Sequence, residues 1–488
     1  MEAKLDRSGI RPPIATGEAV PQNRLAHLGT VLILLSLTAC GGGGGDGNSR
    51  PASGDDPFAT TGGGDSAADG SEVIGYQTSP GVAVCSSDDI KARVDYDMRD
   101  YYLYHDLVPD VALSGVESSE ALMGLLRVEP DRYSYVTDDR AITQLREEGI
   151  TEGFGFWSRP NAGDQAVRFR EILAGSPAEI AGIQRGDELI AINGQAVREF
   201  DDDQLREVVS APTISLSIRT LEEAPRDVSL MSAEYRWTTA PAASIHTVTA
   251  SGLRIGYLTV RRFLSTTEAE IDRQMAWFVE QGVDELVVDF RYNPGGRSRV
   301  AQHLASQIAG AAVEGQIYQI GSANDKYTNW NFSSRFETEP HSLGLTRVVV
   351  LATGFSASAS EALINGLDPY IDVVVIGSRT EGKPYSSFSE TYCDKSINAM
   401  SLIRTNADGV DVIGGIEPTC AVNDSWYYPQ EDPNNDALFA ASIDYLVNER
   451  CPARFAKSTL TNDRSATPFD TRAMSPGQVL SEDLIDTL

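Results

Sequence analysis

The residues best suited to chemistry lie in one serine-rich stretch, Thr353-Gly354-Phe355-Ser356-Ala357-Ser358-Ala359-Ser360-Glu361. The β-prone run Val348-Val349-Val350-Leu351 precedes it, and apolar residues at helical spacing follow it. A serine at such a strand-to-helix turn lies among unpaired backbone N–H groups, at the positive end of the helix dipole. That position favours an oxyanion, which a serine nucleophile needs beside it. The stretch is therefore a candidate site of nucleophilic catalysis.

The same stretch also has a purely structural interpretation. Ser358 and Glu361 have the spacing of a capping box, which many helices carry for stability alone. Taken by themselves, these residues favour the structural cap, because such caps are common. The hypothesis of a nucleophile therefore depends on what the rest of the chain contains.

Length and charge limit the classes of function. The chain has 488 residues, enough for two to four domains at about 150 residues per domain. Its formal charge is −30, from 40 basic and 70 acidic side chains, and no basic stripe interrupts the acidic composition. A phosphate backbone would be repelled by such a chain, so nucleic acid is excluded as a partner.

The N-terminal region predicts export. Leu28 to Ala39 is a 12-residue apolar run, too short to span a bilayer, which takes about 20 residues, but suited to a secretory signal peptide. The ending Leu37-Thr38-Ala39-Cys40 resembles a bacterial lipobox, in which Cys40 would become the lipidated first residue of the mature protein. The alternative is a chance cysteine after an ordinary signal peptide. The resemblance implies a protein of the cell envelope, on the periplasmic face of the outer membrane or the cell surface, held by a lipid anchor only.

Four cysteines remain once Cys40 is set aside: Cys85, Cys393, Cys420 and Cys451. An even number in an exported chain predicts two disulfides, with three possible pairings. The pairing we favour joins Cys393 to Cys420 and Cys85 to Cys451, and the alternative is two or more free thiols. The sequence contains neither C-x-x-C nor H-E-x-x-H, so no metal site and no cofactor are predicted.

The pattern of apolar and polar residues changes several times along the chain, which predicts separate segments. Ile90, Val94, Met98 and Tyr101 have helical spacing, and a second helix is predicted over 119–126. Short alternating strands follow, and from residue 253 the order is strand, helix, strand, which predicts parallel strands covered by helices. The predicted segments are a signal peptide at 1–40, a flexible tether at 41–80, a helical segment at 81–140, a β-rich domain at 141–222, an α/β core at 223–455 and a polar tail at 456–488.

The β-rich domain resembles a PDZ domain. Gly153-Phe154-Gly155-Phe156 is similar to the carboxylate-binding loop of that family, and Gly175-Ser176-Pro177-Ala178 with the later Gly186-Asp187 is similar to its inner signature. The resemblance implies that backbone N–H groups of Gly153, Phe154, Gly155 and Phe156 bind the terminal carboxylate of a peptide that adds a strand. A plain glycine turn is the alternative for the loop alone.

A second motif, Asp289-Phe290-Arg291-Tyr292-Asn293-Pro294-Gly295-Gly296, follows a buried strand at 286–288. By itself it would be an ordinary Pro-Gly turn. Together with Ser-Ala-Ser-Ala-Ser-Glu and a later Gly-Lys pair, it resembles the ordered signature of the carboxyl-terminal processing (tail-specific) serine peptidases. The resemblance extends from about residue 86 to 450. It implies a multidomain α/β fold with a small helical segment, a PDZ-like domain and a core like that of the crotonase and ClpP superfamily.

The resemblance assigns roles to particular residues. Ser358 corresponds to the nucleophile, and Lys383, 25 residues later, to the general base. The N–H of Ala359 and that of Gly295 or Gly296 would form the oxyanion hole. A lysine can act as base only when neutral, and burial can lower its pKa from about 10.4 by several units. The resemblance therefore implies an endopeptidase that cleaves proteins near free C-terminal tails through an acyl-enzyme.

Two positions depart from the family pattern. Pro384 follows the lysine where the family usually has glycine, and Ser387 stands where a glutamine usually orients the lysine. Ser387, or its neighbour Ser386, would have to take over that role. An inactive member of the same fold that binds peptides or other ligands at the envelope is therefore an alternative function. A passive scaffold that uses only its PDZ-like domain is a third, but it leaves the Ser and Lys spacing unexplained.

Other chemistries have less support. A Ser-His-Asp triad would need a histidine, and none of the four histidines after the predicted signal peptide lies in a local catalytic signature. Residues 377–383 match the P-loop spacing, but Pro384 stands where that motif needs a Ser or Thr hydroxyl for magnesium.

Overall fold

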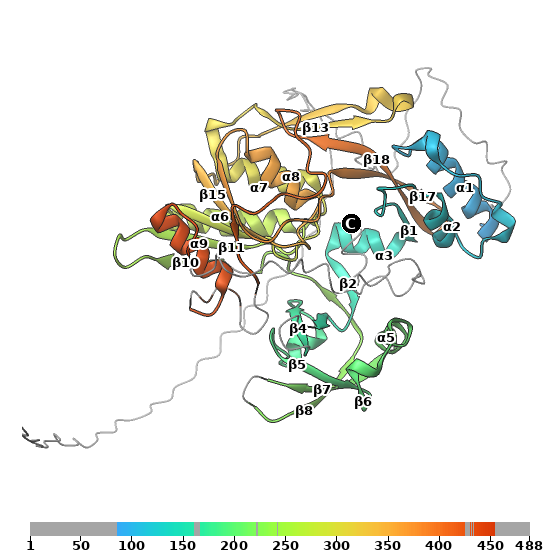
Figure 1. Cartoon of the computed structure of the whole chain (residues 1–488), viewed down its shortest axis with the longest axis horizontal. Coiled ribbons are helices and arrows are strands. Elements are labelled where there is room, and N and C mark those ends of the chain that lie inside the picture. The colour runs from blue at the N-terminus through green and yellow to red at the C-terminus, as the bar shows by residue number, and fades with distance from the viewer. Residues whose placement is uncertain are drawn as a thin grey trace, which may run out of the picture. The chain divides into compact units, whose positions relative to one another are not determined.

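The computed structural model describes residues 85–160, 166–220, 223–241, 243–424, 430, 432 and 434–453 (Figure 1). The predicted signal peptide with Cys40, the predicted tether and the predicted polar tail lie outside these residues. None of the helices in the described part of the chain is long and apolar enough to cross a membrane.

The described chain begins with a helical segment. Helix α1 (Ser87–Asp100) is capped by Ser86 and buries Val94 and Met98, and α2 (Ser119–Leu126) buries Leu122 and Leu126. The short turns η1 (His105–Leu107) and η2 (Leu113–Gly115) lie between them. The segment ends in a strand that the sequence did not indicate, β1 (Tyr135–Asp138), which pairs antiparallel with a strand of the core. Next come α3 (Asp139–Thr143) and a π-helical turn, η3 (Gln144–Glu148).

The PDZ-like segment is a sheet with two short helices. Its strands, in spatial order, are β3 (Phe156–Pro160), β4 (Val167–Ile172), β5 (Glu188–Ile192), β7 (Thr213–Arg219) and β8 (Arg226–Met231), and β6 (Gln195–Ala196) pairs with β5. The helices are α4 (Pro177–Ile180) and α5 (Asp202–Val209), and η4 (Val197–Glu199) is a single turn. The two-stranded ladder of β2 (Ile150–Gly153) and β9 (Ala233–Arg236) leads into and out of this sheet. Strand β8 follows residue 222, where the predicted β-rich domain ends.

The core contains a six-stranded sheet. Its strands, in spatial order, are β10 (Ala243–Thr247), β11 (Arg254–Thr259), β12 (Glu285–Asp289), β15 (Arg347–Ala352), β16 (Asp372–Gly377) and β19 (Cys420–Ala421). From β11 to β19 the neighbours are parallel, and β10 is antiparallel to β11. The helices are α6 (Thr267–Gln281), α7 (Ser298–Ala309), α8 (Ala359–Leu367) and α9 (Ala437–Asn448).

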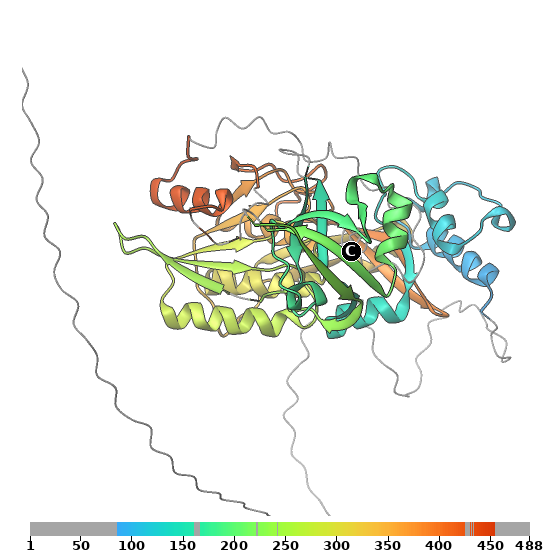
Figure 2. The same ribbon diagram turned by 90° about the horizontal axis from the view of Figure 1, so that it is seen from below.

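Both faces of this sheet are covered, as Figure 2 shows with α6 (yellow-green) and α9 (red) on opposite sides. Val288 and Val350 face the side of α6, α7 and α8. Val287 and Val349 face α9. All four valines are fully buried, and each contributes about 1.5–3 kcal/mol of hydrophobic stabilisation. This explains why these strands appear in the sequence as continuous apolar runs rather than alternating patterns.

A second sheet connects the N-terminal helices to the core. Its strands run in the order β1, β18 (Lys395–Thr405), β13 (Ile317–Ala323) and β14 (Phe332–Arg335), and β17 (Tyr385–Tyr392) also pairs with β18. The turns η5 (Gly310–Ala312) and η6 (Asp325–Trp330) flank β13. Met400 and Ile397 of β18 pack with Val94 and Met98 of α1 in one buried cluster, so α1 and α2 cover one face of this sheet.

The four cysteines of the described residues form two disulfides, but the pairing we predicted is wrong. Cys85 bonds to Cys393, and Cys420 bonds to Cys451. Cys393 lies in the turn between β17 and β18, beside the start of α1. The 11 residues of β18 span about 35 Å and carry the chain away before it reaches Cys420 on β19. Proximity in sequence was therefore misleading.

We expect the double substitution Cys420→Ser/Cys451→Ser to lower the free energy of unfolding by about 3–4 kcal/mol. The reason is that this disulfide closes a segment with a sequence separation of 31, and the entropy of such a loop in the unfolded chain has that magnitude. Urea denaturation measures the loss, and peptide mapping without reductant identifies the pairs. A linked Cys393–Cys420 peptide in the map would contradict the structure.

Candidate active site

The serine-rich stretch forms the turn between β15 and α8. Ser358 is the residue immediately before α8, and its backbone has φ +54° and ψ −112°. This conformation costs a residue other than glycine about 1–3 kcal/mol. An ordinary helix cap has extended backbone and needs no such strain. The turn therefore places Ser358 in a conformation that capping alone does not explain.

The neighbouring serines hold this turn in place. The Ser356 hydroxyl donates to the Phe290 carbonyl at 2.6 Å, and the Ser360 hydroxyl donates to the Asn293 carbonyl at 2.9 Å. Both serines are fully buried, whereas Ser358 is partly exposed. The three serines of the motif thus differ in environment, and Ser358 is the one accessible from a pocket.

Glu361 is the centre of a hydrogen-bond network that the capping-box interpretation only partly anticipates. Its buried carboxylate accepts the Ser358 N–H at 2.9 Å, as a capping box requires. It also accepts the Thr380 hydroxyl at 2.5 Å and the N–H groups of Gly382 at 2.7 Å and Lys383 at 2.8 Å. Burial raises the pKa of Glu361, and these hydrogen bonds oppose that rise. One carboxylate therefore fixes both the serine turn and the backbone of the lysine.

The loop after β12 is anchored by a buried arginine. Arg291 is fully buried and pairs with Asp289 at 2.8 Å, with Asp436 at 2.7 Å and with Asp424 at 3.0 Å. Burial alone would raise the pKa of Asp289, but the Arg291 guanidinium lowers it well below its usual range. Breaking a buried pair of this kind by removing one partner costs about 3–5 kcal/mol, so the loop has a rigid base.

The same loop brings backbone N–H groups to the serine. A side chain on Gly295 would place its Cβ 2.7 Å from the Ser358 Cβ and 2.8 Å from the Ala359 nitrogen, so only glycine fits there. The Gly295 N–H donates to the Asn293 side chain at 2.9 Å. Among the described residues, no acceptor takes the N–H of Gly296 or Ala359. Of the three predicted oxyanion donors, these two are the ones available to a ligand.

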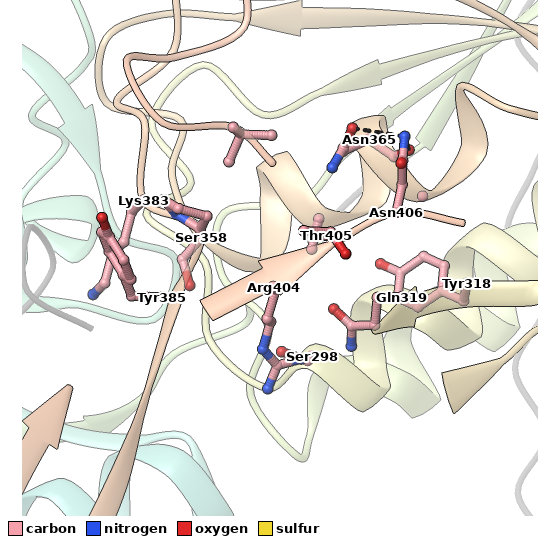
Figure 3. Close-up of a pocket in the computed structure, with 14 residues that line it drawn as sticks. Ser298, Tyr318, Gln319, Ser358, Asn365, Lys383, Tyr385, Arg404, Thr405 and Asn406 are labelled. Atoms are coloured by element: carbon pink, nitrogen blue, oxygen red, sulfur yellow. Dashed lines mark hydrogen bonds between the residues drawn. The ribbon is translucent and has the colours of Figure 1, made fainter. Parts of the chain in front are cut away.

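Lys383 lines the same pocket as Ser358 (Figure 3). Its side chain is buried, and its Nζ lies 4.9 Å from the centre of the Tyr133 ring. Burial, with a contribution from the nearby Arg262, lowers the pKa of Lys383 from 10.5 to about 7. A substantial fraction of the amine is therefore neutral at neutral pH, as a general base requires.

Part of the surroundings of Lys383 comes from residues 131–135, near the end of the predicted helical segment. Asp131 and Tyr133 end the N-terminal segment, yet Asp131 opposes the drop in the Lys383 pKa and Tyr133 forms part of the wall around the amine. The Tyr133 hydroxyl donates to the Gly382 carbonyl at 3.5 Å. No local signal in residues 131–135 could have indicated this contact, which spans about 250 residues of chain.

The predicted orienting serines are placed differently from each other. Ser386 accepts a hydrogen bond from Arg404. Ser387 lies in β17 opposite Met400, and in the described part of the chain no hydrogen bond joins it to Lys383. The lysine backbone is instead held by Glu361.

The PDZ-like loop keeps two backbone donors unused. Within the described residues the N–H groups of Phe154 and Gly155 have no acceptor, while their carbonyls accept from Ala178 and Leu173, each at 2.9 Å. Gly155 has φ +79°, and a Cβ there would lie 2.0 Å from the Ser176 Cβ. The loop can therefore offer consecutive N–H groups to a carboxylate.

Strand β4 of the PDZ-like sheet reaches the turn that carries Ser358. The Arg170 guanidinium lies 4.1 Å from the centre of the Phe355 ring and 4.9 Å from that of Tyr292. The next residue, Glu171, pairs with Arg261 of the core at 2.7 Å. The PDZ-like segment and the turn that carries Ser358 are therefore in direct contact.

Two other kinds of site, a serine-histidine site and a metal centre, were considered for the described residues. None of the histidines among them lines the pocket of Ser358. Nor do the described His, Cys, Asp or Glu residues gather in groups of three or more that could hold a metal ion.

Two segments of the chain match families of known proteins. Residues 254–422 match the model of peptidase family S41, and residues 168–216 match that of the PDZ domain. The carboxyl-terminal-processing protease of Synechocystis sp. is 26% identical over 244 residues, 49% of this chain and 55% of its own length. The chloroplastic C-terminal processing peptidase of Tetradesmus obliquus is 25% identical over 313 residues, 61% of this chain and 66% of its own. The chain thus spans between half and two thirds of the length of these relatives.

A solved S41-type structure from Bacteroides fragilis shares the fold, with a TM-score of 0.59 and 23% identity over 73% of this chain and 97% of that one. Together these findings show that the core is similar to peptidase family S41 and to carboxyl-terminal-processing proteases, and that the segment before it is similar to a PDZ domain. The predicted multidomain α/β fold is confirmed.

We expect the substitution Lys383→Met to stabilise the fold most at low pH. Below pH 7 the amine is charged in both the folded and the unfolded state, so the whole cost of burying the charge is present. Between pH 7 and the unfolded value near 10.4 the folded state has released its proton and the cost falls. The gain in unfolding free energy should be roughly 3–5 kcal/mol at pH 6 and much smaller at pH 10, as measured by urea denaturation.

The matched control is Lys326→Met, because Lys326 is exposed and its replacement should change stability little at either pH. A gain from Lys383→Met that is the same at pH 6 and pH 10 would contradict a buried amine of low pKa.

Proposed function

We propose that this protein is a serine endopeptidase that uses Ser358 and Lys383 as a catalytic dyad. The observation that carries the proposal is that a serine in a strained turn and a buried lysine with a pKa of about 7 line one pocket. An accessible serine or a buried lysine alone can serve a purely structural role. Their combination beside two unused backbone donors matches the needs of acyl transfer.

In the proposed reaction, the neutral Lys383 amine removes the proton from the Ser358 hydroxyl as its oxygen attacks the scissile carbonyl. The N–H groups of Ala359 and Gly296 stabilise the negative charge on the carbonyl oxygen. Lys383 then gives its proton to the leaving amine, and a water activated by the same amine hydrolyses the acyl-enzyme. Each such donor contributes a factor of about 10²–10³ in other serine peptidases, so the rigid loop that carries Gly296 contributes to the proposed reaction together with the dyad.

The PDZ-like loop would recruit substrates by their free C-terminal tails. The unused N–H groups of Phe154 and Gly155 support this role, since they can bind a terminal carboxylate while the peptide adds a strand. The predicted anchor through Cys40 would hold the enzyme at the cell envelope. The two disulfides are in keeping with an oxidising compartment of that kind.

A catalytically inactive tail-binding protein is the second candidate. The observation that favours it is the pair of departures beside the lysine, Pro384 and Ser387. Ser386, the other residue that could have oriented the amine, accepts a hydrogen bond from Arg404. The two candidates differ in one measurable property, since only the peptidase converts a bound tail into products.

We expect Ser358→Ala and Lys383→Ala each to reduce kcat by a factor of about 10³ or more, because each removes one member of the proton-transferring pair. The substrate is an unstructured peptide with an apolar C-terminus, and mass spectrometry detects the products. Ser389→Ala and Lys326→Ala are matched controls at exposed positions and should retain activity.

Equal product formation by wild type, Ser358→Ala and Lys383→Ala would exclude the dyad. A wild type that binds the peptide but leaves it intact after long incubation would favour the tail-binding protein.

We expect amidation of the substrate's C-terminus, or the substitution Gly155→Ala, to raise KM about tenfold, or about 1.4 kcal/mol, with little change in kcat. Amidation removes the carboxylate, and an alanine at position 155 would collide with Ser176. The matched control is Gly182→Ala, which also has a positive φ but open space around its Cβ. A KM that responds to neither change would contradict tail recognition by this loop.

A further inference from the structure

The pocket that contains Ser358 and Lys383 extends away from them along α8. Ala362 and Gly366 follow Ser358 on one face of this helix and line the pocket wall. Four consecutive residues of α8 rise about 6 Å, which sets the spacing of Ala362 and Gly366 along this wall. Its far end is formed by β13 and β18, as Figure 3 shows with Tyr318, Gln319 and Thr405, and Arg404 lies between them and Ser358 in this view.

An irregularity in β13 turns two adjacent side chains to this pocket. Successive residues of a regular strand point to opposite faces, yet Tyr318 and Gln319 both line the pocket. The register between β13 and β14 shifts at this place, between Ile317 and Gln319. Such bulges re-aim side chains, often next to active sites. The Tyr318 ring is also held against Gly366, where a Cβ would lie 2.6 Å from a ring carbon.

Both of these side chains have unsatisfied polar atoms. Tyr318 is completely buried and Gln319 is 4% exposed. Within the described chain, neither the Tyr318 hydroxyl nor the Gln319 Oε1 has a hydrogen-bond partner. A buried hydroxyl or amide without a partner is costly, and two of them facing one pocket beside a nucleophile indicate a ligand that completes them.

The unsatisfied atoms specify the ligand's chemistry. Gln319 Oε1 accepts and so requires an N–H donor, whereas the Tyr318 hydroxyl can donate to an oxygen. Arg404, whose Nε donates to Ser386, also lines the pocket, and its charge acts on Tyr318. A carboxamide offers both an N–H donor and a C=O acceptor within one planar group, so it matches this arrangement. An apolar side chain of the same length would leave the buried atoms unsatisfied.

Charge separates a carboxamide from a carboxylate. Arg404 and Lys383 both line the pocket, and none of its lining residues is acidic. A cationic side chain would be repelled. A carboxylate would be attracted, but beside Lys383 it would favour the charged ammonium and so reduce the fraction of the base that can accept a proton. A neutral carboxamide makes the hydrogen bonds without this penalty.

We propose that the pocket formed by Tyr318, Gln319 and Arg404 selects substrates with glutamine, or the shorter asparagine, adjacent to the scissile bond. This inference rests on the proposed peptidase function and names a substrate class for it. The polar end of the pocket would hold the carboxamide, and the face of α8 would contact the methylene groups.

The test uses three peptides that are identical except at one position, which carries glutamine, glutamate or methionine. These three side chains have similar length. We expect kcat/KM to be about 100-fold higher for glutamine than for methionine, since a site built to hydrogen-bond a side chain rejects an analogue without those groups. Glutamate should be intermediate, and the acidic limb of its pH–rate profile should lie at higher pH than that of glutamine. Mass spectrometry of the products identifies the bond that is cut.

Two variants test the assignment to these residues. Tyr318→Phe keeps the ring and removes the hydroxyl, and Gln319→Met removes the amide. Each should lower the ratio of kcat/KM for the glutamine peptide to that for the methionine peptide about tenfold or more, mainly by lowering kcat/KM for the glutamine peptide. The matched control is Tyr370→Phe, which removes a neighbouring hydroxyl that donates to the Ile317 carbonyl at 2.9 Å outside the pocket. It should leave the ratio unchanged.

The outcomes distinguish this inference from the proposed function. Cleavage that favours methionine or glutamate over glutamine, or a ratio that Tyr318→Phe and Gln319→Met leave unchanged, would overturn the inference and leave the peptidase intact. If the wild type cuts no peptide, the peptidase proposal fails. The Ser358→Ala variant then tests the pocket by fluorescence anisotropy: tighter binding of the glutamine peptide than of the methionine peptide supports it, and equal binding overturns it.

Discussion

The geometry of the candidate site depends on the hydrogen bonds that the buried carboxylate of Glu361 accepts. It accepts hydrogen bonds from the backbone of Ser358 and from that of Lys383, two residues delivered by different loops. A carboxylate that takes four donors at once leaves each loop little freedom to move independently. The serine and the lysine therefore keep their relative placement through one shared partner rather than through a long chain of contacts. Glu361, which the sequence predicts as part of a helix cap, therefore also joins the two loops that carry Ser358 and Lys383.

The surrounding fold explains why these loops lie close enough to share Glu361. Parallel strands β12, β15 and β16 end at the same edge of the sheet, and each is followed by one part of the site: the Gly295-Gly296 loop, the Ser358 turn and the Lys383 loop. This is the expected location of a site in an open α/β sheet. The Arg291 cluster secures the first of these loops from below, and the second sheet encloses the lysine from the side. Burial then lowers the pKa of the amine.

Much of this arrangement could be predicted from the sequence because it is local. The helices at 87–100 and 119–126, the strand at 285–289 and the serine turn each have a pattern within a short window. What could not be predicted depends on contacts between distant segments. The position of Tyr133 beside the lysine, the pairing of β1 with β18 in the second sheet and the exchanged disulfide partners all depend on where β17 and β18 run. The second role of Glu361 was hidden because its first role, as a cap, was already sufficient to explain it.

The left-handed backbone of Ser358 has a consequence for attempts to make the protein more robust. A glycine would adopt φ +54° without cost, so the fold itself would benefit from losing the hydroxyl on which the proposed chemistry depends. Directed evolution that selects for heat tolerance alone would therefore be drawn toward substitution at this position. Thermal stability and the proposed catalytic activity therefore make opposite demands on residue 358. A screen for heat-tolerant variants has to measure both properties.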